Sequence, residues 1–129
     1  MSIVRKVIGA AVSLGLLVGI EAAAVAQESG TVKIPYLRVE WEQVSSRGGY
    51  RNICGRVYND RDTPARHVFV QFDGLDDTGK QVSSRFAEVI GDVPPRGYAI
   101  FCLLVSAQGT SYRVTVPRVD WSAGVTQSP

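Results

Sequence analysis

Three kinds of side chain in this sequence could carry chemistry: two cysteines, one histidine and several carboxylates. Cys54 and Cys102 are the only cysteines, and His67 is the only histidine. A serine or cysteine triad needs a histidine beside its nucleophile, and zinc takes three or four His, Cys or carboxylate ligands. The cysteines also lack the close CxxC spacing of redox catalysts. We therefore predict no enzyme, no cofactor and no metal site.

Aspartates gather in two stretches that could be considered for calcium. Asp60 and Asp62 form one stretch, and Asp73, Asp76 and Asp77 form the other, with Asp92 farther along the chain. Calcium prefers loops rich in oxygen ligands, but aspartate is also an ordinary turn residue and no EF-hand spacing occurs. We expect these aspartates to shape turns.

The first 26 residues follow the order of a secretory signal peptide. Arg5 and Lys6 precede an uncharged run over residues 7–20, and Ala24 and Ala26 fit the small subsites of a signal peptidase. The run is shorter than the roughly 20 apolar residues that cross a bilayer, so an uncleaved anchor is the less favoured alternative. We predict cleavage after Ala26, a soluble mature chain without a membrane segment, and a periplasmic or extracellular location.

The remaining residues, 27–129, have the length of one domain. The whole chain has 14 Lys and Arg against 12 Asp and Glu. This balance provides no strong positive field for nucleic acid or an anionic membrane, so we expect no nucleic-acid partner. The frequent β-branched and aromatic residues favour strands over helices.

Clusters of Gly, Pro, Asn and Asp divide the chain into runs of alternating apolar residues. The six expected strands are 34–44, 50–59, 66–75, 80–90, 98–105 and 111–121. Weak alternation in 80–90 is typical of an edge strand, and Pro117 predicts a bulge in the last strand. Trp41 and Trp121 are expected in the core.

This strand pattern predicts an all-β fold, an immunoglobulin-like antiparallel β-sandwich of about six to seven strands. The sandwich domain is expected to span residues 33–121. Residues 27–32 would form a short N-terminal segment, and residues 122–129 a flexible tail.

The two cysteines are expected to form a disulfide, because exported proteins fold in an oxidising space. Two free thiols are the alternative. Cys54 has the opposite parity to its apolar neighbour Ile53, and Cys102 has the opposite parity to Phe101 and Leu103. Both cysteines should therefore point away from the core.

An antiparallel pairing of the second and fifth strands would allow this disulfide, as in immunoglobulin-like topology. Placing the two cysteines opposite each other also aligns Tyr58 with Tyr98, and Gly55 with Phe101. The first is an aromatic cross-strand pair, and in the second a ring covers a strand glycine. The three pairs together favour this register.

The run NICGRVYN, residues 52–59, resembles the GxVxN strand of FxLYD-type domains. Residues 64–72 are similar to that family's next strand, and the segments 77–80, 93–97 and 99–101 keep the family's order. At the place of the FxLYD segment, this chain has FDGLD. The resemblance covers residues 32–121. It implies an immunoglobulin-like sandwich of bacterial exported proteins, with no common activity and no catalytic residues to carry over.

The predicted register places Tyr58, Tyr98, Ile100 and Leu104 together beside the disulfide, on the outer face. This face is more apolar than a solvated face needs to be, which can mark a contact surface. The alternative is that the chain near residues 34–36 covers it.

These observations favour a non-enzymatic binding module that contacts a protein partner in the cell envelope. A small-ligand or carbohydrate-binding domain, with sugars stacking on aromatics such as Phe69, is one alternative. A structural, self-associating protein is another, because an exposed edge strand can form a homodimer by extending a sheet.

Overall fold

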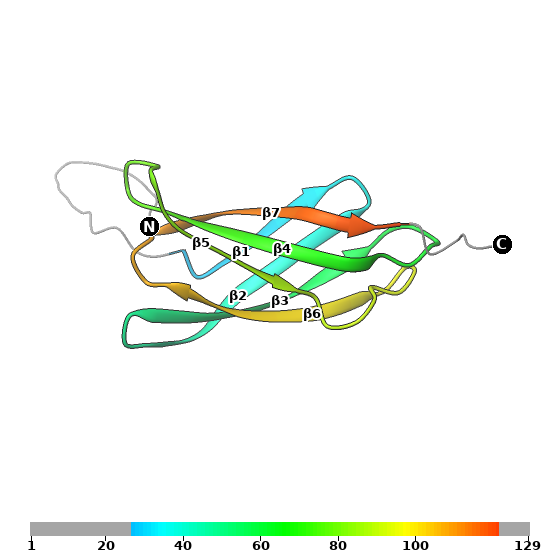
Figure 1. Cartoon of the computed structure of the whole chain (residues 1–129), viewed down its shortest axis with the longest axis horizontal. Coiled ribbons are helices and arrows are strands. Elements are labelled where there is room, and N and C mark those ends of the chain that lie inside the picture. Colours follow the sequence, from blue (N-terminus) through cyan, green and yellow to red (C-terminus); the bar gives the residue numbers. More distant parts are fainter. Residues whose placement is uncertain (1–26, 122–129) are drawn as a thin grey trace, which may run out of the picture.

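The computed structural model describes residues 27–121 (Figure 1). The predicted signal peptide, its cleavage site after Ala26 and the predicted tail at 122–129 lie outside the described residues.

Two antiparallel sheets make up the described part of the chain, with strand orders β1-β2-β3-β6 and β5-β4-β7 (Figure 1). The order β2-β3-β6 corresponds to strands A, B and E of an immunoglobulin-like sandwich, and β5-β4-β7 to C′, C and F. The predicted all-β antiparallel sandwich is therefore confirmed. The seven strands are β1 (Ser29–Ile34), β2 (Leu37–Arg47), β3 (Tyr50–Asn59), β4 (Arg66–Leu75), β5 (Gln81–Glu88), β6 (Tyr98–Ser106) and β7 (Ser111–Asp120).

Helix is absent from residues 27–121, so this region offers no helical segment that could cross a membrane.

Strand β1 is the element that the six-strand prediction missed. It pairs with β2 along its whole length, whereas the prediction began the first strand at Ile34. The turn that separates the two strands contains Tyr36, at φ 71°. Gly30 lies opposite Trp41, and a Cβ at Gly30 would come within 2.8 Å of the indole Nε1. At Gly30 the strand thus packs bare backbone against a ring, and only Val32 and Ile34 contribute apolar side chains to the core.

The core lies between the two sheets and is centred on aromatic rings. Trp41 meets Phe72 and Tyr112 edge-on, with ring centroids 5.3 and 5.4 Å apart. Phe72 also contacts Phe101, which is fully buried. The predicted core position of Trp41 is confirmed, whereas Trp121 packs against the core but remains partly exposed.

The irregularities of the smaller sheet agree with the sequence pattern. Strand β5 lies at an edge, as predicted. Phe69 lies opposite Arg118 and Gln71 opposite Thr115, so β7 has one residue more than β4 between these pairs. The predicted bulge at Pro117 is therefore confirmed.

Polar side chains close both ends of the sandwich. At one end, Arg51 Nη1 donates hydrogen bonds of 2.7 Å to the Gly109 carbonyl and to the Tyr112 hydroxyl. At the other, the buried Asn59 Nδ2 donates to the carbonyls of Thr63, at 2.8 Å, and Val93, at 3.2 Å. Both side chains extend from β3 and tie loops to it.

Asp73 is a buried carboxylate that joins all three strands of the smaller sheet. It accepts hydrogen bonds from Gln71 on its own strand, from Ser84 on β5 and from Arg113 on β7, at 3.0, 2.7 and 3.1 Å. Burial acts to raise the pKa of Asp73, but these hydrogen bonds outweigh burial and hold the pKa below its ordinary value. The charged form is therefore favoured in the folded chain.

Acid should weaken the fold through Asp73. A carboxyl with a lowered folded pKa stabilises the protein above its unfolded pKa, and this stabilisation is lost as pH falls through the folded pKa. We expect Asp73→Asn to lower the free energy of unfolding by about 1–3 kcal/mol at neutral pH and to flatten its decline below about pH 4. Urea titrations at several pH values measure both effects. Asp77→Asn, at an exposed position, is the control, and equal pH slopes in wild type and Asp73→Asn would contradict the assignment.

Candidate interaction surface around the disulfide

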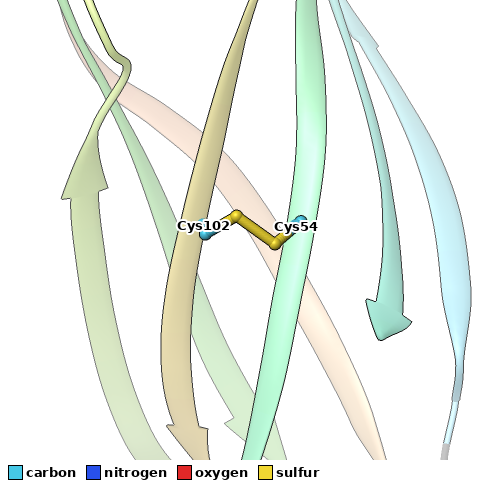
Figure 2. Close-up of a disulfide and its surroundings, with 2 residues drawn as sticks. All are labelled: Cys54 and Cys102. Carbon is cyan, nitrogen blue, oxygen red and sulfur yellow. A yellow bond between two sulfur atoms is a disulfide. The ribbon is translucent and has the colours of Figure 1, made fainter. Parts of the chain in front are cut away.

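The disulfide joins Cys54 on β3 to Cys102 on β6, two neighbouring strands of the larger sheet (Figure 2). The two residues lie directly opposite each other, with Cα atoms 4.1 Å apart. Cys102 is exposed and Cys54 is half-buried, so the bond lies on the outer face of the sheet. The predicted pairing of the second and fifth strands is confirmed, together with Tyr58 opposite Tyr98 and Gly55 opposite Phe101.

Gly55 is required at its position because the backbone carbonyl of Glu40 and the ring of Phe101 both lie against it. A Cβ at Gly55 would stand 2.7 Å from Cζ of the fully buried Phe101. The ring therefore fills the space above the glycine. This contact lies on the inner face of β3 and β6, and the disulfide lies beside it on the outer face.

The four residues predicted to form a contact surface do share the outer face of β3 and β6. Tyr98, Ile100 and Leu104 are exposed by 48%, 48% and 50%, and Tyr58 is half-buried. The chain near residues 34–36 does not cover them: Ile34 packs against the core, and Tyr36 lies against Trp121. Within residues 27–121, the apolar face is therefore open.

Two arginines that the sequence analysis did not single out complete this face. The guanidinium Cζ of Arg38 lies 4.1 Å from the ring centroid of Tyr58, and that of Arg56 lies 4.8 Å from Tyr98. The two tyrosine rings are 5.6 Å apart. Arginine over an aromatic face is a favourable cation–π contact. The result is a pair of neighbouring tyrosine rings on β3 and β6 with one arginine over each ring, which we call the Arg–Tyr stack.

Both arginines of this stack are held in place by polar contacts and carry positive charge. A hydrogen bond from Arg56 Nη1 to the Tyr58 hydroxyl, at 3.4 Å, raises the pKa of Arg56 further. Arg38 is held by Glu40, whose Oε2 lies 3.1 Å from Nε. The stack therefore presents permanent positive charge beside apolar side chains.

A shallow hollow of about 560 Å³ lies on the outer face, around the disulfide. Its polar lining comes from Glu40 and Glu42 on β2 and Arg56 on β3, and its apolar lining includes Ile100 on β6. A hollow with charges of both signs beside apolar side chains could form ion pairs and apolar contacts with the surface of another protein.

The remaining candidate chemical residues have other neighbours. His67 is exposed, with Nδ1 3.4 Å from Glu88 Oε2, and it lines a second hollow of about 410 Å³ that contains no serine or cysteine. Asp62 pairs with Arg96, and this contact raises the pKa of Arg96. No group of three or more His, Cys, Asp or Glu placed to hold a metal ion occurs in residues 27–121.

Asp76 has the turn role expected for it. Its Oδ1 accepts hydrogen bonds from the Thr78 hydroxyl and from the backbone N–H groups of Thr78 and Lys80, which lower the pKa of Asp76. The side chain thereby shapes the turn between β4 and β5.

Two further aromatic clusters lie outside the contact surface. Phe69, the residue considered for sugar stacking, is half-buried and meets Phe86 edge-on at 6.2 Å. At one end of the sandwich, the guanidinium of Arg61 lies 4.8 Å from Tyr36 and 4.7 Å from Trp121. In both clusters the rings contact neighbours from their own chain.

Comparisons with known protein families, curated proteins and solved structures found no match. The resemblance to FxLYD-type domains therefore stays a prediction.

Removing the disulfide should cost much of the stability. The two cysteines are 48 residues apart, and closing a loop of this length is worth about 4 kcal/mol on the chain-entropy model. We expect the double variant Cys54→Ser and Cys102→Ser to lose about that much free energy of unfolding in urea. Wild type in reductant is the matched control. Identical unfolding curves for oxidised and reduced wild type would contradict this role.

Gly55→Ala should destabilise the fold without touching the disulfide. The added methyl group would clash with the Glu40 carbonyl and overpack the core against Phe101, at a cost of about 1–3 kcal/mol. Gly49→Ala is the control, because a Cβ there meets nothing within 4 Å. Thermal unfolding of both variants decides the point, and equal midpoints would refute the steric explanation.

Proposed function

We propose that this protein is a non-enzymatic, exported binding module that contacts a protein partner of the cell envelope. The contact surface is the outer face of β3 and β6, with Tyr58, Tyr98, Ile100 and Leu104. The observation that carries the proposal is the exposure of about half of Tyr98, Ile100 and Leu104 on one face. An exposed patch of this kind is typical of interaction sites.

The neighbouring residues support a protein rather than a small ligand. Interfaces are enriched in tyrosine and arginine, and both occur in the Arg–Tyr stack. The hollow around the disulfide is shallow and carries both signs of charge, whereas small-molecule sites are concave and mostly apolar. A rigid, disulfide-linked strand pair also limits the ordering that binding would require.

Export is the second part of the proposal. The signal-like residues 1–26 and the disulfide both support an oxidising compartment, periplasmic or extracellular. The resemblance to FxLYD-type domains of bacterial exported proteins is consistent with the same compartment.

A photo-cross-linking amino acid at position 100, in cells that export the protein, tests the surface. We expect an adduct between the chain and a different envelope protein from position 100, and no such adduct from position 86. Phe86 is the matched control because it is also exposed and apolar, but it lies on β5 of the other sheet. Adducts of equal yield from both positions, or none from position 100, would refute the proposed surface.

Substitution gives the energetic side of the same test. Ile100→Ser should weaken binding of the captured partner by about tenfold or more, as expected for a residue central to an interface, whereas Phe86→Ser should leave it unchanged.

A further inference from the structure

Strand β6 is an edge strand with no protection by charge or proline. Natural edge strands usually carry lysine, other charges, proline or a bulge, which discourage pairing with another chain. The other three edges follow this pattern: β1 has Lys33, β5 has Arg85, and β7 has Arg113 and Pro117. Strand β6, with the sequence YAIFCLLVS, has none of these residues.

The disulfide shows which backbone groups of β6 face outward from the sheet. A Cα separation of 4.1 Å between Cys54 and Cys102 is typical of a non-hydrogen-bonded antiparallel pair. The N–H and C=O groups of Cys102 therefore point away from β3, as do those of Ile100 and Leu104, two residues away on either side. The Ile100 carbonyl confirms this direction, because it accepts a hydrogen bond of 3.0 Å from the N–H of Ile90.

That hydrogen bond limits the free edge to the second half of β6. The Ile100 carbonyl is occupied, whereas the outward groups of Cys102 and Leu104 have no partner among residues 27–121. A pairing strand can thus use Cys102 and Leu104 but not the carbonyl of Ile100.

We propose that this edge binds a second copy of the chain, with the two β6 strands antiparallel about a two-fold axis at Leu103. In this register Cys102 lies opposite the partner's Leu104, and Leu104 opposite the partner's Cys102. Each is a hydrogen-bonded pair that exchanges two backbone bonds, so every free outward group of these residues finds a partner. An axis at Cys102 would instead require the occupied carbonyl of Ile100.

The side chains favour a copy of the same strand as the occupant. Because β6 carries no charge, a two-fold pairing brings no like charges together in any register, whereas the other edge strands all carry charged side chains. On the outer face, Leu104 would lie diagonally across from the partner's Leu104 and Ile100, which covers apolar surface on both copies. The two four-stranded sheets would become one continuous sheet.

Sedimentation of the purified mature chain over a range of micromolar concentrations tests this inference. We expect the mass to rise towards that of a dimer in wild type. Leu104→Lys should weaken the dimer by about tenfold or more, because the two new charges would lie diagonally across the axis. Thr31→Lys adds the same charge on the outer face of β1, the opposite edge of the same sheet, and should dimerise as wild type does. Circular dichroism verifies that both variants are folded.

A wild-type chain that stays monomeric throughout, or a dimer that Leu104→Lys and Thr31→Lys weaken equally, would overturn the pairing. The inference does not rest on the proposed function, and the two fail separately. A monomer that still cross-links to a different envelope protein through position 100 would refute the dimer but not the proposed function. A β6 dimer without any such adduct would support the pairing and would refute the proposed contact with a different envelope protein.

Discussion

The register between β3 and β6 is the constraint on which the rest of the structure depends. Because side chains alternate across a strand, a slip of one residue would turn every inward side chain outward. In the observed register, Gly55 admits the ring of Phe101 on the inner side, and the outer side holds the disulfide. The same alignment sets which residues form the core and which form the exposed apolar face. Core and contact surface are two sides of one pairing.

Much of this arrangement could be predicted from the sequence because it follows from strand periodicity. The parity of Cys54 and Cys102 against their apolar neighbours was enough to place the disulfide outside the core and to align three cross-strand pairs. The bulge at Pro117 and the weak pattern of β5 were visible for the same reason, since both are local departures from period-two alternation. The approximate positions of the other strands followed from their apolar residues.

What could not be predicted depends on contacts between elements. Strand β1 was missed because only Val32 and Ile34 alternate as apolar side chains, while Gly30 contributes backbone alone to its contact with Trp41. The Arg–Tyr stack was missed because it requires the alignment of β2 with β3, which puts Arg38 opposite Tyr58. The cysteine positions indicate a register for β3 and β6, but no comparable pair of residues indicates one for β2. Likewise, charged Asp73 resembles a turn residue in the sequence, and only the arrangement of β5 and β7 around it shows that it is buried.

The connectivity of the larger sheet has a consequence for the order of folding. Strands β1, β2 and β3 follow one another along the chain and are joined by short turns. Strand β6 pairs with β3 over a much longer distance in the sequence, since the paired cysteines are 48 residues apart. Pairings between distant segments form slowly, because the entropy of loop closure is lost before their contacts are gained. The closing of β6 onto β3 is therefore a late event, and the disulfide makes it permanent. An oxidised chain that unfolds keeps this long-range contact, so it starts refolding with one of its long-range searches already completed.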